Sequence, residues 1–219
     1  KDGLGTIRLA GPRGNAMSQA LVSDLSTALR TVGGEPSVKA ILLASAHPKL
    51  FCPGLDLVAL SEVTREDMGA FMLDFSALLT DLFALKKPVI AAVNGAAVAG
   101  GCLLALTADW RIAKRGAPMG LNEVKVGVPL PWSAVMLLKT ASPTFAQAAV
   151  ALLGRNFEGD AAKAAGLAHE IAEPDVFDGV VAERLAEFAE KDAYAFGVTK
   201  GYLRGAAVAS MPMLPDASR

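Results

Sequence analysis

The residues best suited to chemistry lie between Lys87 and Pro129. Glu123 is a carboxylate among apolar neighbours, at the end of the run Gly120-Leu121-Asn122-Glu123. Burial in such surroundings raises the pKa of a carboxyl group toward the range that proton transfer at neutral pH requires. A surface glutamate that opens a helix is the alternative interpretation, because a negative charge is also favourable there.

A glycine turn precedes Glu123. The run Val89–Val93 is typical of a buried strand, and Gly100-Gly101 then leads into Cys102–Leu106, which fits a buried helix. The first N–H groups of a helix lack partners within it, and a glycine pair lets a ligand approach the backbone closely. Two such donors and a buried carboxylate would suit the formation of an enolate. Taken singly, Gly54 and Gly100 are better explained as residues that only permit turns.

The composition is that of a folded globular protein. The chain has 219 residues, of which 53% are hydrophobic and 20% charged, and length alone allows one or two domains. Lys and Arg number 21 and Asp and Glu 22, so the net charge of -1 offers no overall basic field for nucleic acid. No apolar run reaches the roughly 18 residues that span a membrane. We therefore predict no nucleic-acid partner and no membrane partner.

The cysteines and histidines do not suggest a metal site. Cys52 and Cys102 lie far apart in apolar or glycine-rich surroundings, which favours a reducing compartment. His47 and His169 have no ligand-like neighbours in the sequence, so we predict no metal. We expect a cytoplasmic protein. Because the chain begins at Lys1 rather than Met, a removed leader and a mitochondrial matrix location stay open.

Strand and helix patterns alternate along the first part of the chain. Strands are expected at 6–9, 40–44, 89–93 and 110–113, and helices after Ser18, over 68–85 and from Cys102. From Trp132 the chain is expected to be mainly helical, with Asp160 and Asp175 as caps and a last helix over 193–208. This alternation predicts an α/β fold with largely parallel pairing.

Four stretches resemble the crotonase (enoyl-CoA hydratase/isomerase) superfamily, and within it the Δ3,Δ2-enoyl-CoA isomerases most. They are residues 51–57, 92–112, 120–132 and 155–170, and the similarity extends from Ile7 to about Arg204. It implies a crotonase (ClpP-like) spiral of ββα units followed by a C-terminal helical region. Residues 1–140 would form the core with the CoA-binding and catalytic loops, and residues 141–219 a covering and oligomerisation region. The resemblance also implies a homotrimer or a dimer of trimers.

The same resemblance assigns roles to individual residues. Glu123 would be the catalytic acid and base, and the backbone N–H groups of Leu55 and Gly100 would bind the thioester oxygen. The substrate-binding residues would be Pro53, Gly54, Leu55, Asp56, Leu57, Gly100, Leu103 and Arg13.

Pro53 and Asp56 belong to the stretch 51–57 that resembles the family's first CoA-binding loop, and Arg13 lies outside it. Arg13 is a candidate for a CoA phosphate contact, as is Lys49. Asp56 is expected to order its loop rather than to act as a second base. Pro53 departs from the small residue of most relatives: it keeps a carbonyl that could accept from the adenine amine but has no N–H.

Leu103 bears on the reaction. Hydratases have a second catalytic glutamate at this position, which helps to activate water, whereas the isomerase branch has an apolar residue there. A 1,3 proton shift needs only one carboxylate. We therefore predict an enzyme that moves the double bond of a 3-enoyl-CoA to the 2-position through a dienolate. The resemblance implies unsaturated fatty-acid degradation as the pathway, and bacterial secondary metabolism, which uses the same scaffold, stays open. Coenzyme A would be part of the substrate, and no separate cofactor is expected.

Two other functions stay open at this point. One is hydration or another crotonase reaction, in which Asp56 or Glu62 supplies the missing carboxylate. The other is a non-catalytic acyl-CoA-binding subunit. In each case the depth of the acyl pocket is expected to depend on how four side chains pack, namely Phe71, Phe75, Leu103 and Trp132.

Overall fold

A computed structural model describes residues 3–61 and 63–211 of the chain, which contain two sheets. The larger sheet is parallel, with strand order β1-β2-β4-β6-β9. Its strands are β1 (Leu4–Leu9), β2 (Ala40–Ser45), β4 (Val89–Val93), β6 (Trp110–Lys114) and β9 (Glu170–Ala172). The predicted strands at 6–9, 40–44, 89–93 and 110–113 are confirmed.

The smaller sheet stands beside the larger one and has the order β3-β5-β7-β8. Its strands are β3 (Leu50–Cys52), β5 (Ala96–Val98), β7 (Met119–Gly120) and β8 (Asn156–Phe157). The chain therefore steps from the large sheet to the small one after β2, β4 and β6, because β3, β5 and β7 each follow a strand of the large sheet. The small-sheet strands carry the loops that bear the predicted site.

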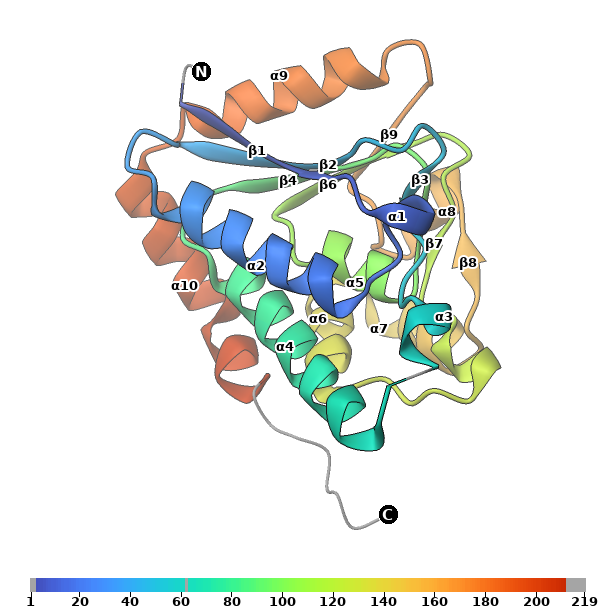
Figure 1. The fold of residues 1–219 in the computed structure, drawn as a ribbon. Helices are drawn as coiled ribbons and strands as arrows, with labels where there is room; N and C mark the ends of the chain where they lie inside the picture. The colour runs from blue at the N-terminus through green and yellow to red at the C-terminus, as the bar shows by residue number, and fades with distance from the viewer. Residues whose placement is uncertain (1–2, 62, 212–219) are drawn as a thin grey trace.

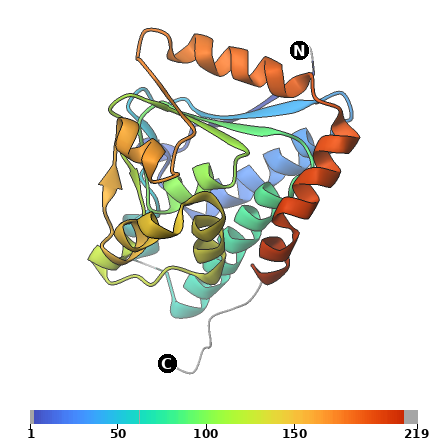
Figure 2. The same ribbon diagram turned by 180° about the vertical axis from the view of Figure 1, so that it is seen from behind.

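Helices cover both faces of the large sheet (Figure 1). α9 (Phe177–Ala189) lies on one face, and α2 (Gln19–Gly34), α4 (Arg65–Ala84) and α5 (Gly100–Leu106) lie on the other. Figure 2 shows α10 (Ala193–Ser210) running along the edge beside α4. The remaining helices are α1 (Pro12–Asn15), α3 (Leu57–Leu60), the 3₁₀-helix η1 (Glu123–Val126), α6 (Trp132–Ala141), α7 (Thr144–Gln147), the π-helix η2 (Ala148–Leu152) and α8 (Gly159–Ala164).

Capping was predicted correctly for one helix and wrongly for two. The Ser18 side chain accepts from the Leu21 N–H at the start of α2. The residues before α8 and α9 are instead Glu158 and Val176, and neither makes a side-chain cap. Asp160 lies inside the first turn of α8, where a carboxylate favours the helix dipole without capping the helix.

The core lies on both faces of the large sheet. Every residue of β4 is buried, as expected for a parallel strand with helices on both sides. One cluster packs α9 onto the sheet through Phe177, Val181 and Leu185. The larger cluster fills the space between the sheet and the helices α2, α4 and α5.

A buried ion cluster ties α10 to the core. Asp109 accepts hydrogen bonds from Lys200 Nζ at 2.7 Å and from the Val89 N–H at 2.8 Å. It also forms a salt bridge with Arg204, whose Nη2 lies 2.9 Å from Asp109 Oδ1. Burial lowers the pKa of Lys200 to about 8, although the neighbouring Asp109 opposes this shift. Removing the carboxylate would leave two largely buried cations without their anion.

We expect Asp109→Ala to lower the free energy of unfolding by about 3–5 kcal/mol, because it breaks a buried ion pair from one side. Urea denaturation of the variant and the wild type measures this difference. Arg115→Ala is the control: Arg115 pairs with Asp160 and Glu173 at the surface, so the stability should stay nearly unchanged. Equal effects of the two variants would contradict the importance of the cluster.

Candidate active site

Close backbone contacts hold the loop of residues 51–57 against the start of α5. A β-carbon on Gly101 would collide with the carbonyl oxygen of Cys52. Gly54 has a φ of +96°, and a β-carbon there would lie 2.8 Å from the Ala99 β-carbon and 3.3 Å from the Gly100 nitrogen. Glycine is therefore required at positions 54 and 101. Gly54 contacts Gly100, and Leu55 is the residue that follows Gly54 in the sequence.

The segment that carries Glu123 is fixed to the same turn. The Ala99 N–H donates to the Gly120 carbonyl oxygen at 2.8 Å, and Glu123 begins η1 three residues later. Ala99 itself has φ 50° and ψ -130°, a conformation that residues with a β-carbon rarely adopt. Strain of this kind persists only where the surrounding structure imposes it, often at functional sites. Ala99 was not singled out from the sequence.

Two backbone N–H groups in this region are available to a ligand. The Met17 N–H donates to the Gly54 carbonyl oxygen at 2.8 Å, and the Asp56 N–H donates to the Met17 carbonyl oxygen at 3.0 Å. In this parallel bridge the N–H of Leu55 faces away from Met17. Gly100 is the first residue of α5. Within residues 3–61 and 63–211, neither the Leu55 nor the Gly100 N–H donates to a backbone carbonyl.

Glu123 is buried without a partner for one of its oxygens. Its residue surface is only 8% exposed, and Oε2 has no hydrogen-bond partner within the part of the chain that the structure describes. Burial raises the pKa of this carboxyl group above its ordinary value. Glu123 is thus a carboxylate whose charged form is poorly stabilised and which could accept a proton.

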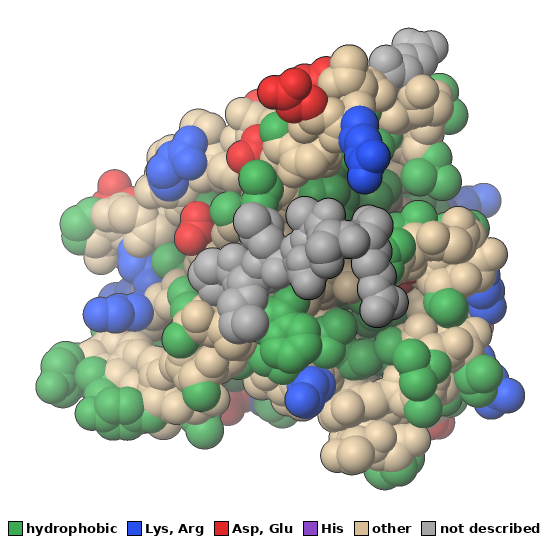
Figure 3. All heavy atoms as spheres, turned by 90° about the horizontal axis from the view of Figure 1, so that it is seen from below, with side chains coloured by type: hydrophobic (Ala, Val, Ile, Leu, Met, Phe, Trp, Pro, Cys, Tyr) green, Lys and Arg blue, Asp and Glu red, His purple; other side chains and the backbone are tan. Residues whose placement is uncertain are grey.

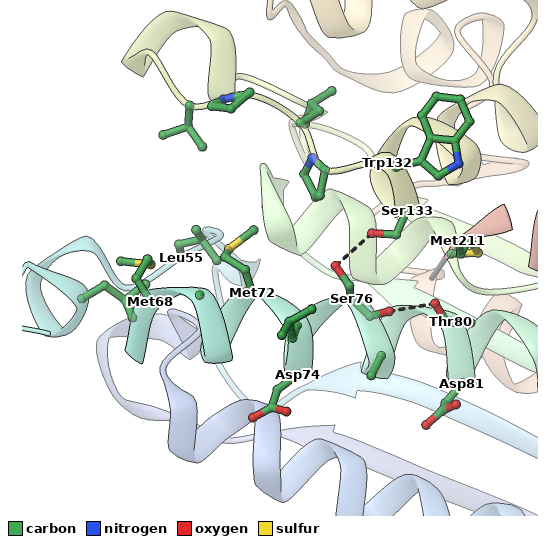
Figure 4. A pocket seen from close by; sticks show the side chains of 18 of the residues that line it. Leu55, Met68, Met72, Asp74, Ser76, Thr80, Asp81, Trp132, Ser133 and Met211 are labelled. Atoms are coloured by element: carbon green, nitrogen blue, oxygen red, sulfur yellow. Dashed lines mark hydrogen bonds between the residues drawn. The ribbon is translucent and has the colours of Figure 1, made fainter. Parts of the chain in front are cut away.

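A cavity of about 1060 Å³ opens beside Leu55, between α4 and residues 128–133 (Figure 4). Its wall is mostly apolar and includes Leu57, Leu60, Met68, Met72, Leu130, Trp132 and Met211. Ser133 Oγ donates to Ser76 Oγ at 3.1 Å across the wall. Asp74 and Asp81 point to the other side of α4 (Figure 4). Hydrophobic side chains gather on the face of the molecule seen in Figure 3.

The predicted pocket residues lie elsewhere with one exception. Phe71, Phe75 and Leu103 belong to the core, with Leu103 only 1% exposed, and the cavity wall does not include them. Trp132 does line the cavity. The phenylalanines recur every four residues along α4, and that face of the helix packs toward the sheet. The cavity uses the neighbouring face with Met68, Met72 and Ser76, which were not predicted to line a pocket.

The predicted binding residues do not all meet at the cavity. Leu55 and Leu57 line it, while Gly54 and Gly100 contact each other next to Leu55. Glu123 is connected to the wall through one hydrogen bond, from the Val128 N–H to the Glu123 carbonyl oxygen at 3.0 Å. Pro53 is half-buried in the loop after β3, and Lys49 is exposed. Their contacts with CoA stay predictions.

Arg13 pairs with Asp56, which the sequence analysis did not foresee. Arg13 Nε donates to Asp56 Oδ2 at 2.8 Å, and Nη2 donates to the same oxygen. Asp56 Oδ1 accepts from the Ala59 N–H at 3.1 Å and so caps α3. The hydrogen bond from Arg13 lowers the pKa of Asp56. Asp56 therefore orders its loop. Glu62, the other carboxylate considered, lies outside the described residues.

We expect Glu123→Gln to raise the free energy of unfolding by about 1 kcal/mol at neutral pH, because it removes a buried charge that lacks a partner. The folded-state pKa is raised, so the wild type loses stability as the pH rises from the unfolded to the folded pKa. The gain should therefore shrink below the unfolded pKa.

Thermal and urea unfolding at several pH values tests this expectation. Glu183→Gln, on the exposed side of α9, serves as the control and should change little. A Glu123→Gln variant that is less stable than the wild type at neutral pH would show that the carboxylate is favourably solvated or paired.

Comparisons with known proteins identify the family of the chain. The family described as enoyl-CoA hydratase/isomerase matches residues 1–211. The mitochondrial methylglutaconyl-CoA hydratase of Homo sapiens is 31% identical over 159 residues, which are 73% of this chain and 47% of that protein. The (E)-benzylidenesuccinyl-CoA hydratase of Thauera aromatica is 30% identical over 199 residues, 91% of this chain and 76% of that protein.

A solved structure of an enoyl-CoA isomerase from Mycobacterium tuberculosis has a TM-score of 0.89 and 27% identity, over 96% of this chain and 91% of the other. The chain belongs to the enoyl-CoA hydratase/isomerase family, and its fold is the crotonase fold. It spans about half the length of the human hydratase that it matches.

Two further findings concern metals and membranes. Among the described residues, no three His, Cys, Asp or Glu side chains are grouped so that they could hold a metal ion. No described helix combines the length and the apolar character that crossing a bilayer demands. The predicted absence of a metal, the oligomeric state and the cellular compartment stay predictions.

Proposed function

We propose that this chain is an enoyl-CoA isomerase that moves the double bond of a 3-enoyl-CoA to the 2-position. The observation that carries the proposal is the buried carboxylate of Glu123, which has one oxygen without a partner and lies on a segment hydrogen-bonded to the turn that presents the Gly100 N–H. A reaction that moves one proton between two carbons needs one acid-base group and a means of holding negative charge on oxygen.

The chemistry follows from these groups. Glu123 removes a proton from C2 of the acyl chain, and the electrons of that C–H bond pass toward the thioester oxygen. The N–H groups of Leu55 and Gly100 donate to this oxygen while the dienolate exists. The protonated Glu123 then gives its proton to C4, so the double bond stands between C2 and C3. No atom is gained or lost.

The energetic contributions are of different kinds. Each N–H donor acts mainly on charge that develops in the transition state, and losing one donor of this type costs about 3 kcal/mol. The raised pKa of Glu123 makes it a stronger base than an ordinary carboxylate. It also reduces the difference between the pKa of Glu123 and that of the C2–H group from which it removes the proton. Positioned acid-base groups contribute about 10²–10⁴-fold to rates.

The cavity beside Leu55 would hold the acyl chain. The Leu55 side chain lines it, and the N–H of the same residue is the proposed donor to the thioester. The thioester would therefore lie at one end of the cavity, with the chain running along α4 toward Trp132 and Met211 (Figure 4). The apolar wall favours a hydrocarbon chain.

Hydration is the second candidate, because the relatives from Homo sapiens and Thauera aromatica are hydratases by name. Two observations favour isomerisation. Leu103 is apolar and buried at the position where the family resemblance places the second glutamate of hydratases. Asp56, a possible replacement, is already paired with Arg13 and caps α3, so it is a poor base.

The test is to mix the purified protein with cis-3-hexenoyl-CoA and to follow the ultraviolet absorbance of the conjugated 2-enoyl thioester. We expect a rise in the wild type and a rate lower by about 10²–10⁴-fold in Glu123→Gln. Glu183→Gln should retain the wild-type rate, because it lies on α9, which covers the opposite face of the large sheet.

Product analysis separates the competing functions. A 3-hydroxyacyl-CoA formed directly from a 2-enoyl-CoA would favour hydration over isomerisation. Binding of the thioester without any turnover would favour a non-catalytic binding subunit. An unchanged rate in Glu123→Gln would remove this residue from the mechanism.

A further inference from the structure

The chain makes an unusual left-handed turn at α1. Arg13, Gly14 and Asn15 have φ values of 48°, 69° and 71°. The conformation is unfavourable for Arg13, whereas Asn15 can adopt it more readily because its short polar side chain hydrogen-bonds locally. Such a turn persists only if neighbouring groups hold it.

Asn15 anchors the turn to the sheets. It is almost fully buried, and its Oδ1 accepts from the Gly11 N–H at 2.8 Å. Its Nδ2 donates to Ser45 Oγ at 2.8 Å and to the Phe51 carbonyl oxygen at 3.0 Å. The amide therefore joins the end of β1 to β2 and β3, and the strained turn is fixed in position.

The fixed turn directs Arg13 at Asp56. Both Nε and Nη2 donate to Asp56 Oδ2. The Asp56 side chain is only 1% exposed, whereas that of Arg13 is 51% exposed. The partly exposed Arg13 guanidinium thus donates charge-assisted hydrogen bonds to one oxygen of the buried Asp56 carboxylate. The Ala59 N–H donates to its other oxygen. The carboxylate is thus held at both of its oxygens.

Asp56 adjoins Leu55, whose N–H is the proposed donor to the substrate. On the backbone, Met17 holds residues 54 and 56 through two hydrogen bonds. On the side chain, Arg13 holds Asp56. The Leu55 N–H shares one planar peptide unit with the Gly54 carbonyl, so this unit cannot rotate without breaking the hydrogen bond from Met17. Asp56, held through its side chain, fixes the other side of Leu55. Arg13 and Met17 lie on either side of Asn15 in the same segment, so one local structure controls the direction of this N–H.

We propose that Arg13 is a positioning residue: its ion pair with Asp56 aims the Leu55 N–H at the thioester oxygen of the substrate. This inference rests on the proposed function. It differs from the expectation that Arg13 binds a CoA phosphate, because here the guanidinium acts through Asp56 on catalysis rather than on CoA affinity. The two roles predict different kinetic changes.

The first experiment measures isomerisation by Arg13→Gly and Arg13→Lys. Glycine removes the guanidinium and tolerates a φ of 48°, so the turn itself should survive. We expect kcat to fall about tenfold or more in Arg13→Gly, a part of the effect of losing an oxyanion donor, with KM within about twofold. Arg13→Lys should recover part of kcat. Arg115→Ala, which removes an exposed arginine with two acidic partners, should match the wild type.

The second experiment reads the carbonyl directly. Hexanoyl-CoA labelled with ¹³C at the thioester carbonyl binds without a double bond to move, and infrared spectroscopy reports its carbonyl stretch. We expect binding to the wild type to lower this frequency through the two N–H donors, and Arg13→Gly to reduce the shift while the thioester still binds. Asp56→Asn, which keeps an N-capping side chain for α3, should act in the same direction if Arg13→Gly does not fold.

Other results of these two experiments would contradict a positioning role for Arg13. A raised KM with unchanged kcat and carbonyl frequency would overturn the proposal and identify Arg13 as a CoA phosphate contact. A full carbonyl shift in both Arg13→Gly and Asp56→Asn would overturn it as well and leave the proposed function intact. If the wild type itself gave no shift on binding, the oxyanion site of the proposed function would fail, independently of Arg13.

Discussion

The start of α5 lies so close to the end of β3 that only a hydrogen fits on Gly101 beside the Cys52 carbonyl. This close contact between Gly101 and the Cys52 carbonyl determines how the neighbouring segments are arranged. It sets Gly100 against Gly54, and the hydrogen bond from Ala99 to Gly120 then brings the segment with Glu123 to the same turn. The segments with Gly54, Gly100 and Glu123 are far apart in the sequence, and these contacts place all three around the proposed reaction centre. Each segment follows a strand of the smaller sheet, namely β3, β5 and β7.

The same region holds groups that oppose folding. Glu123 is buried with an unpartnered oxygen, Ala99 has a strained backbone, and Arg13 takes a left-handed conformation. These features persist because other parts of the chain are strongly stabilised. The buried strand β4 and the cluster around Asp109 hold the large sheet and α10 together. The groups of such a site lower the free energy of unfolding but hold the catalytic groups in the positions that the reaction needs, as is common in enzymes.

The sequence predicted those features that depend on local pattern. Alternating or apolar runs indicated four of the five strands of the large sheet, but not β9. Ser18 indicated the cap of α2, and Gly100-Gly101 marked the start of α5. It failed where contacts join distant positions. Arg13 and Asp56 are 43 residues apart, and nothing in the spacing distinguishes this pair from two exposed charges. The cavity wall was also predicted poorly: Phe71 and Phe75 were expected to influence the depth of the pocket, but they pack into the core, while Met72 and Ser76 line the cavity.

The most direct test of the single-carboxylate mechanism is to follow the transferred proton. A 3-enoyl-CoA is converted in deuterium oxide, and nuclear magnetic resonance measures hydrogen and deuterium at C4 of the product. If buried Glu123 carries the proton from C2 to C4, part of the original hydrogen should appear at C4, and that product should be lost in Glu123→Gln. Hydrogen at C4 that comes wholly from the solvent, or solvent oxygen at C3, would contradict the account.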